Sequence, residues 1–300
     1  MGAPLYIVDA FTDRPFAGNP AGVVTRAEAL SDEQMQAIAR ELRHSETCFV
    51  ADASEPGVDF HLRWFTPMVE VDLCGHATVA AYTCLAEEGR INFSGGIAHV
   101  RYATRRGVLS VWVEGEGKET RGVMMSAGVA PIAAAPDNRV DAARAIGLDP
   151  PAMDEDLPMA VDSANARLIV PVGRLEDLLS LKPDHERMRG YAEATGYRRF
   201  TLICRETLNP SFSTHLRHFA PGAGVAEDPV TGTAHAAIAV YLDWLGLLSE
   251  GEKVSYEGEQ GHAVGRPGSV KVEVHRRDGI ITDVRIGGHA VIVARGEIEI

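Results

Sequence analysis

The chain of 300 residues has few cysteines and no long uncharged segment. Its four cysteines, Cys48, Cys74, Cys84 and Cys204, include no Cys-x-x-Cys pair, which argues against both a zinc ribbon and a disulfide framework. The longest run without a charged residue, 122–136, is too short to span a membrane and contains two prolines. We therefore expect reduced thiols and no membrane-spanning segment.

Basic residues are also in short supply. The chain has 29 Lys and Arg against 42 Asp and Glu, for a formal net charge of −13, and no stripe of basic residues interrupts this excess. Such a charge repels nucleic-acid phosphates and anionic lipid, so we expect neither nucleic acid nor a membrane as partner. The N-terminus reaches Asp9 and Asp13 before a secretory hydrophobic region can form, which predicts a cytoplasmic protein.

The sequence contains an internal repeat, which limits the possible folds before any single helix or strand is assigned. HLRWFTP at 61–67 recurs as HLRHFAP at 215–221, with five of seven positions identical. CGHATVAAYTCLAEEG at 74–89 aligns with TGTAHAAIAVYLDWLG at 231–246 in the same order and at nearly the same offset. The spacing is close to half the chain length, which predicts a duplicated unit.

Each copy of the repeat can be read as a strand, a loop and a helix. In the first copy apolar residues alternate with polar ones from Phe60 to Trp64, which predicts a strand with one buried face, and 212–218 alternates likewise. The helix that follows is apolar on nearly all sides and ends at Gly89 or Gly246. A helix of this kind must be surrounded, so we expect each one inside a curled sheet.

The remaining segments complete an α+β fold. Ser31 and Gln34 form a capping pair at the start of an amphipathic helix predicted over 31–44, and a second surface helix is predicted from Pro183 toward Gly196. Short strands are predicted at 5–8, 98–102, 108–113, 166–172, 200–204, 270–274, 280–286 and 290–294.

These elements predict two similar α+β halves, each with a central helix inside a curled sheet. The first half is expected to cover 1–122 and the second 123–300.

The starts of the two buried helices are candidates for binding a small anion. Gly75 and Gly232 stand at these starts, where backbone N–H groups and the helix dipole favour negative charge. His76 titrates near neutrality and could move a proton, and Asp228 could hold an ammonium or imidazole. Glu46, between a helix and an apolar strand, would suit a general base if half buried. Capping and ordinary surface roles are the alternative for all three side chains.

Four segments carry a resemblance to a known family. VDAFTDRPFAGNPAGVV, SETCF, DLCGHATVAAY and EDPVTGTAHAAIAVYL occur in this order between Val8 and Leu242. They resemble the signatures of the PhzF family, the phenazine-biosynthesis-type isomerases. The resemblance covers essentially the whole chain and implies the fold that this family shares with diaminopimelate epimerase and proline racemase. In that fold two pseudo-symmetric halves, each an antiparallel barrel-like sheet around a central helix, have the site in the cleft between them. The last strand of this chain, about 290–300, is then expected to pack on the first half.

The resemblance also implies a reaction and a site. The family isomerises a dihydro-hydroxyanthranilate without metal or organic cofactor, with a Glu that moves a proton between carbons; that residue matches Glu46. His76 and Asp228 match the residues that orient the substrate. A small carboxylate-bearing substrate and a homodimer are therefore expected. The substrate-binding positions implied in this chain are Gly75, Ala77, Gly232 and Thr233.

Three other functions stay open. An amino-acid racemase or epimerase could use Cys74 with Glu46 or Asp228, although the second loop has no matching cysteine. A non-catalytic protein could bind a small acid at the same helix starts. A metal-dependent hydrolase or oxygenase is disfavoured because no HExxH or two-His-one-carboxylate spacing appears. The histidines considered for such a metal site are His44, His76, His215, His218 and His235.

Overall fold

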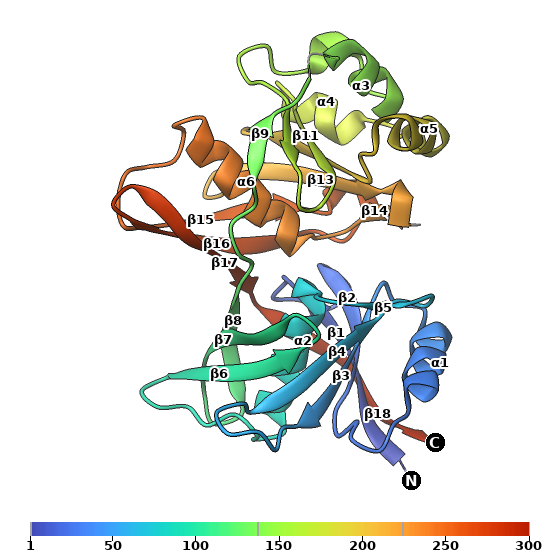
Figure 1. Ribbon diagram of the computed structural model, residues 1–300, viewed down its shortest axis with the longest axis vertical. Coiled ribbons are helices and arrows are strands. Elements are labelled where there is room, and N and C mark those ends of the chain that lie inside the picture. The colour runs from blue at the N-terminus through green and yellow to red at the C-terminus, as the bar shows by residue number, and fades with distance from the viewer. Residues whose placement is uncertain (1, 137, 224, 300) are drawn as a thin grey trace. The chain divides into compact units, whose positions relative to one another are not determined.

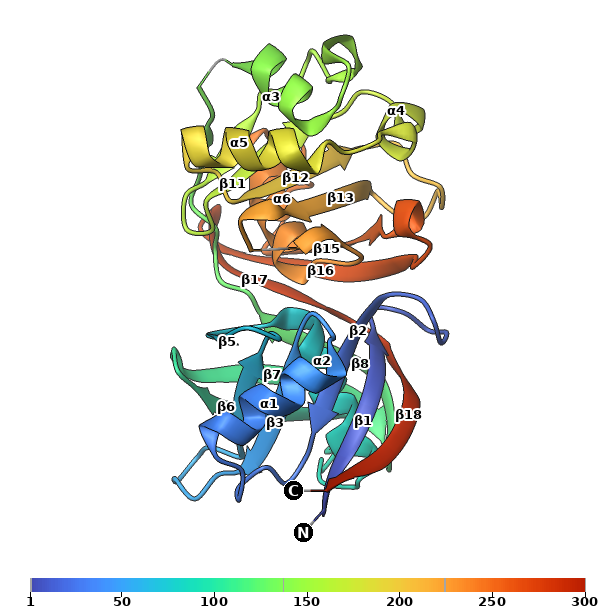
Figure 2. The same cartoon turned by 90° about the vertical axis from the view of Figure 1, so that its right-hand side faces the viewer.

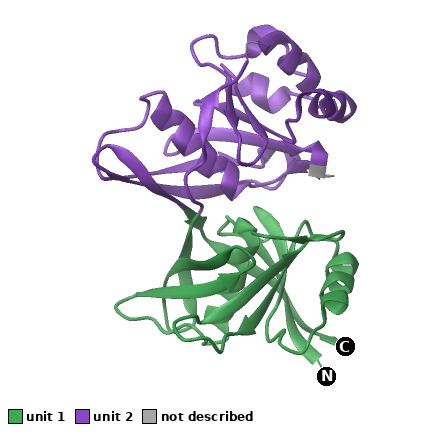
Figure 3. Ribbon diagram, viewed as in Figure 1, with its two compact units in different colours: residues 1–126, 286–300 green, residues 127–285 purple. Residues whose placement is uncertain are grey.

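The computed structural model describes residues 2–136, 138–223 and 225–299. The chain forms two compact units, shown in different colours in Figure 3. Unit 1 comprises Met1–Ser126 with Ile286–Ile300, and unit 2 comprises Ala127–Arg285. The division thus lies at Ser126, close to the expected residue 122, and the segment that returns to unit 1 begins at Ile286, a few residues before the last strand.

Unit 1 is a strand-rich unit with two helices in its described part (Figure 1). Its strands are β1 (Gly2–Ala10), β2 (Asn19–Val24), β3 (Thr47–Asp52), β4 (Phe60–Phe65), β5 (Glu70–Val71), β6 (Ile97–Thr104), β7 (Gly107–Glu116), β8 (Glu119–Ser126) and β18 (Ala290–Glu299). Its helices are α1 (Asp32–Leu42) and α2 (Gly75–Glu87).

Most strand pairs of unit 1 are antiparallel. β1 lies between β18 and β2, as Figure 2 shows, and β3 pairs with β4. β6, β7 and β8 form a meander. Two pairs are parallel, β2 with β3 and β4 with β6. These parallel pairs arise because a helix, α1 or α2, carries the chain back between the paired strands.

Helix α2 is enclosed by strands, as the sequence predicted. All residues from Gly75 to Ala86 are buried, and the helix packs against β1, β2, β3, β8 and β18. Tyr82 of α2 makes edge-to-face ring contacts with Phe60 and Tyr102, at centroid distances of 6.3 and 5.8 Å. A helix with no polar face is unstable on a protein surface because its apolar side chains would contact water. Enclosure by the strands removes that contact.

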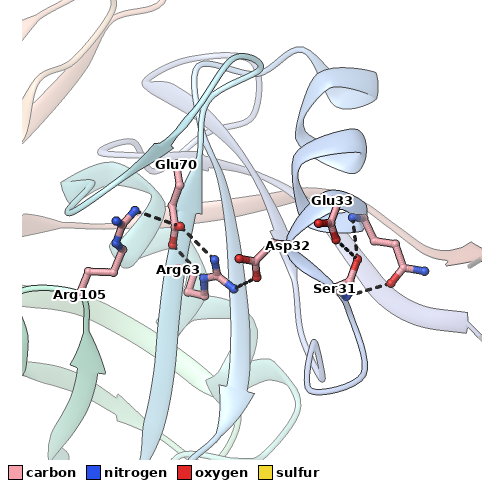
Figure 4. A network of polar contacts seen from close by, with 7 residues as sticks. Ser31, Asp32, Glu33, Arg63, Glu70 and Arg105 are labelled. Atoms are coloured by element: carbon pink, nitrogen blue, oxygen red, sulfur yellow. Dashed lines mark hydrogen bonds and ion pairs between the residues drawn. The ribbon is translucent and has the colours of Figure 1, made fainter.

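Helix α1 lies on the outside of the unit and begins at the predicted capping box. The side chains of Ser31 and Gln34 each accept a hydrogen bond from the other's backbone N–H. Asp32 in the first turn pairs with Arg63 of β4, which also forms a two-point ion pair with Glu70 (Figure 4). These contacts fix where α1 begins and how it lies on the sheet.

Unit 2 combines a sheet with four α-helices in its described part. Its strands are β9 (Ile132–Ala134), β10 (Ala160–Asp162), β11 (Arg167–Pro171), β12 (Arg199–Cys204), β13 (Thr214–Ala220), β14 (Val225–Asp228), β15 (Lys253–Gln260), β16 (Gly268–Arg277) and β17 (Ile280–Gly288), which runs on into the residues of unit 1. Its helices are α3 (Arg139–Ile146), α4 (Leu175–Ser180), α5 (His185–Thr195) and α6 (Gly232–Trp244), with short 3-10 turns at Pro150–Ala152, Pro221–Ala223 and His262–Val264.

The strand pairing of unit 2 repeats that of unit 1. β10 lies between β9 and β11, β11 runs parallel to β12, β12 is antiparallel to β13, and β13 is parallel to β15. This is the order of β1, β2, β3, β4 and β6, including both parallel pairs. The central helices α2 and α6 are both 13 residues long. The topology therefore agrees with the duplication inferred from the repeated motifs.

The prediction that the HLRHF strand has one buried face was wrong. Every residue of β13 is buried, because α3, α4 and α5 cover one face of the sheet while α6 packs on the other (Figure 2). Phe219 joins the first of these cores and Leu216 the second. Helices α3 and α4 were not predicted. Among the described residues, none of the helices has both the length and the hydropathy required to cross a membrane.

Candidate functional site

Glu46 is placed by the end of helix α1. Arg43 ends the helix in the left-handed conformation, with φ 57°, and its N–H donates to the carbonyl of Ala39. The chain then enters β3 at Thr47, and the carbonyl of Glu46 accepts a hydrogen bond from Gly22 N–H at 3.3 Å. The Glu46 side chain is 21% exposed. Its carboxylate is thus largely removed from water at an anchored point of the backbone.

Cys74 and His76 flank the first residue of the buried helix α2. Cys74 is the N-cap residue, with extended backbone, and its side chain makes no capping hydrogen bond. Its carbonyl accepts from both the N–H and the hydroxyl of Thr78, which fixes the first turn. The His76 side chain is only 8% exposed. The imidazole is therefore held at the helix start, where the helix dipole is positive.

The structure brings three of the candidate side chains of unit 1 together. His76 Nε2 lies 3.4 Å from Glu46 Oε2, and His76 Nδ1 lies 3.4 Å from Cys74 Sγ. Ser45 Oγ, which the sequence analysis did not single out, lies 3.3 Å from His76 Nε2. A base, an imidazole, a thiol and a hydroxyl thus share one region, which is a suitable arrangement for moving protons.

The glycine at the start of α2 is not explained by packing. A Cβ added at Gly75 would meet Ile286 Cδ1 at 3.4 Å, which is ordinary van der Waals contact. Packing therefore does not require a glycine at this position. Ala77, in the same helical turn, is fully buried, backbone included, so this structure does not expose the binding position that the sequence implied.

In unit 2, Asp228 ends β14 just before the start of α6. The hydroxyl of Thr231, the N-cap residue, donates to Asp228 Oδ2 at 2.5 Å. Gln260, which is 1% exposed, donates from Nε2 to the carbonyl of Asp228 at 2.8 Å and accepts the Thr231 N–H at 3.0 Å. Gln260 therefore fixes both ends of the loop that carries Asp228. Sequence reasoning missed it because nothing near residue 260 marks this contact.

A buried ion pair supports the first turn of α6. Arg167 is 1% exposed and lies 3.1 Å from the Asp162 carboxylate. Its guanidinium donates to the carbonyl and hydroxyl oxygens of Thr233, at 2.8 and 3.1 Å. Burial lowers the pKa of Arg167 to about 10, which still leaves it cationic at neutral pH. Thr233 follows Gly232 in the predicted binding turn, so Arg167 holds that turn in place.

Three histidines of unit 2, His215, His218 and His235, are buried inside the unit. His215 Nδ1 lies 2.8 Å from Glu259, and His218 Nδ1 lies 2.8 Å from the hydroxyl of Thr201. Burial lowers the pKa of His215 and His218, and that of His235 to about 3. These imidazoles are neutral at physiological pH and belong to the core of the unit.

The predicted site residues thus form two groups. Glu46 and His76 meet in unit 1 together with Cys74, and Gly75 and Ala77 begin the adjacent helix. The second group is in unit 2 and consists of Asp228, Gly232 and Thr233 around the start of α6. The supporting residues Ser45, Arg167 and Gln260 were found only in the structure.

Comparison with known proteins agrees with this architecture. The family model described as phenazine biosynthesis-like protein, PhzC-PhzF, matches residues 8–296. An uncharacterized isomerase from Clostridium acetobutylicum is 32% identical over 301 residues, which cover 98% of this chain and 97% of that protein.

Solved structures show the same relationship. The PhzF-family phenazine biosynthesis protein of Bacillus anthracis superposes with a TM-score of 0.89 at 31% identity, over 100% of both chains. A hydroxyproline epimerase from Agrobacterium vitis shares the fold alone, with a TM-score of 0.62 at 12% identity over 99% of this chain and 92% of that one. Together with the repeated topology and the Glu46 and His76 geometry, these matches show that this chain belongs to the phenazine biosynthesis-like PhzC-PhzF family of isomerases.

Proposed function

We propose that this isomerase moves a proton between carbons of a small, carboxylate-bearing substrate, with Glu46 as the group that takes and returns the proton. The observation that carries the proposal is the largely buried Glu46 carboxylate, 3.4 Å from His76 Nε2. A carboxylate that is partly removed from water and next to an imidazole is a suitable group to accept a proton and return it. His76 Nε2 can donate a hydrogen bond to the ionised Glu46 carboxylate or accept one from the protonated carboxyl group, so it supports either protonation state of Glu46.

The step balances without a further reactant. The Glu46 carboxylate accepts a proton from one substrate carbon, and the electron pair of the broken C–H bond enters the conjugated system. The protonated Glu46 then returns the proton to another carbon of the same system, which restores both the charge and the base. One carboxylate can serve both steps because the substrate gains and loses no proton or electron overall.

Asp228 and the helix starts complete the proposal. Resemblance to the family assigns Asp228 to orienting the substrate, and its ordered loop, fixed by Thr231 and Gln260, suits that task. Each unit, taken by itself, has one such helix start, Gly75 of α2 in unit 1 and Gly232 of α6 in unit 2, where the positive end of the helix dipole favours an anion.

The test replaces Glu46 by Gln, which keeps the shape of the side chain and removes its ability to carry the proton. Conversion of a dihydro-hydroxyanthranilate and of a panel of related unsaturated acids is followed by NMR in D₂O, which also records deuterium entering the product. We expect Glu46→Gln to lower turnover by about 100- to 10,000-fold. Ligand affinity, measured by calorimetry, should change little.

A matched control is Glu41→Gln, because Glu41 is an exposed glutamate on the neighbouring helix α1. It should retain full turnover. Equal activity of the Glu46→Gln and native proteins would show that Glu46 is not the base. Loss of affinity in proportion to loss of turnover would assign it to binding instead.

A second candidate function is supported by Cys74, whose sulfur lies 3.4 Å from His76 Nδ1. A thiol beside an imidazole could remove and return the α-proton of an amino acid. This epimerase predicts that the native protein removes α-deuterium from a labelled amino acid and that Cys74→Ala abolishes the exchange. The isomerase proposal predicts no such loss from saturated amino acids.

A further inference from the structure

The three side chains around His76 also provide the ligand atoms of a zinc site. The carboxylate of Glu46, the thiol of Cys74 and the imidazole of His76 each offer one atom, and these atoms lie within 4.8 Å of one another. We propose that this triplet binds Zn²⁺ and that the bound cation blocks the reaction. The binding rests on the geometry of the triplet; only the blocking rests on the proposed function.

One distance in the triplet already matches a tetrahedral zinc centre. With Zn–S near 2.3 Å and Zn–N or Zn–O near 2.0–2.1 Å, neighbouring ligand atoms lie roughly 3.3–3.6 Å apart. His76 Nε2 and Glu46 Oε2 are 3.4 Å apart. Cys74 Sγ lies 3.4 Å from His76 Nδ1 and 3.9 Å from Nε2, so the imidazole and the thiol have to rotate before one ring nitrogen, the sulfur and the carboxylate face a common point. Ser45 Oγ, at 3.3 Å from Nε2, has only to turn its hydroxyl away.

The chemistry of the ligand set favours zinc over harder cations. A thiolate and an imidazole bind Zn²⁺ well, whereas Mg²⁺ and Ca²⁺ prefer oxygen ligands alone. The Cys74 thiol gives up its proton to solvent when its sulfur binds the metal. Cys74 and His76 are buried, and Glu46 is partly exposed, which leaves the fourth position for a water or a substrate oxygen.

A cation in this position opposes the proton transfer. The lone pairs of Glu46 that would accept the substrate proton are then directed to the metal, and the region beside His76 is occupied. The cation therefore acts as a reversible inhibitor of the enzyme and is removed by a chelator. Among the described residues, this is a site at which zinc concentration can set the activity of the isomerase.

A second group of residues, His215, Glu259 and His262, also meets the distance criterion but is a weaker site. His215 Nδ1 is 2.8 Å from Glu259 Oε1, a hydrogen-bond distance that is too short for two ligands of one metal. The Glu259 oxygens also accept the backbone N–H groups of Leu208 and Asn209. Its carboxylate is already committed to holding the fold.

The binding experiment uses the full chain after treatment with a chelator and dialysis. Co²⁺ alone is titrated first, because a cobalt–thiolate bond gives a charge-transfer absorption in the near ultraviolet, and Zn²⁺ is then titrated by calorimetry. We expect one equivalent of either metal to bind. Cys74→Ser should remove the absorption band, and both Cys74→Ser and Glu46→Gln should weaken zinc binding by at least about tenfold.

Two variants provide matched controls. Cys84→Ala changes a buried cysteine of the same helix, and His262→Asn changes the competing group of residues. Both should keep the cobalt band and the zinc affinity. Absence of the band, binding unchanged by Cys74→Ser, or binding lost in His262→Asn would each overturn the proposed site. If Cys74→Ser fails to fold, the zinc affinity of Glu46→Gln tests the site instead, and an affinity equal to that of the native protein would overturn it.

The activity experiment separates this proposal from the proposed function. Zinc should inhibit turnover in proportion to the fraction of protein carrying metal, and chelator should restore it. If zinc binds to the triplet without inhibition, the blocking role is wrong and Glu46 is not the base. If zinc does not bind while Glu46→Gln is still inactive, the proposed function stands and the zinc site does not.

Discussion

At the scale of single residues, the geometry around Glu46 and Asp228 depends on side chains that come from distant parts of the sequence. His76 reaches Glu46 across 30 positions of the chain, and Gln260 reaches Asp228 across 32. Each contact involves a polar group of a buried residue, His76 or Gln260, so removal of its partner takes a hydrogen bond or ion pair from a group that has little access to water. The cost of an unsatisfied buried group is about 1–3 kcal/mol, which is more than the hydrogen bond itself contributes.

Gln260 gives a prediction at this scale. Gln260→Leu keeps the volume of the side chain but removes the donor to the Asp228 carbonyl and the acceptor for the Thr231 N–H. If Asp228 orients the substrate, the variant should raise KM at least about tenfold and lower kcat less, since two unsatisfied groups loosen the loop. Steady-state kinetics provide the measurement. Glu257→Gln, an exposed change on β15, is the control, and an unchanged KM in Gln260→Leu would contradict the positioning role.

At the scale of elements, the two central helices have the same length and topology but different supports. The first turn of α2 is held by Thr78, whereas the first turn of α6 rests on the buried pair Arg167 and Asp162. A buried charge is tolerated only when it is paired and fully hydrogen-bonded. The pair therefore stabilises the start of α6 only while both partners are present.

This dependence predicts the behaviour of two variants. Arg167→Met should lower the free energy of unfolding by about 3–5 kcal/mol, because the Asp162 carboxylate is left buried without its partner. Adding Asp162→Asn should recover part of that loss, since the Asn side chain is neutral and its one oxygen can still accept one of the two hydrogen bonds from Asn165, which go to Oδ1 and Oδ2 of Asp162. Urea unfolding of the full chain measures both. A double variant no more stable than Arg167→Met would show that the charge of Asp162 is not the cause.

At the scale of the whole molecule, the buried histidines make stability depend on pH. His218 and His235 have pKa values lowered by burial, that of His235 to about 3, so they are neutral in the folded protein while the unfolded chain protonates them below about pH 6.5. Below that pH the unfolded state binds more protons than the folded state. Stability is therefore complete above pH 6.5 and is lost as the pH falls toward 3.

The expected slope is up to about 1.4 kcal/mol per pH unit for each such histidine. Chemical unfolding of the protein at pH 7.5, 6.5 and 5.5 measures it. The variant His235→Gln should flatten the slope by the contribution of one group, whereas the exposed His99→Gln should not. Stability that stays constant from pH 7.5 to 5.5 would show that these imidazoles are not held neutral by the fold.

Much of the architecture could be predicted because it depends on local pattern. The capping box at Ser31 and the apolar sequence of α2 determine their elements through short-range hydrogen bonds and the need to bury every face. Helix α3 was missed because its eight residues are short and only weakly amphipathic, and it is stabilised by packing on α5. The strand β13 was predicted with one exposed face because the helices covering its second face lie elsewhere in the sequence.

The sequence by itself determined the duplicated plan, the buried central helices, and, through family resemblance, Glu46, His76 and Asp228 as the residues to examine. These follow from periodicity and motif, which adjacent residues encode. Only the tertiary structure decided that Glu46, Cys74 and His76 meet, that Gln260 holds the Asp228 loop, and that Arg167 supports the start of α6. Such contacts join residues tens of positions apart, and their energy is gained only when the folded backbone brings both partners out of water together.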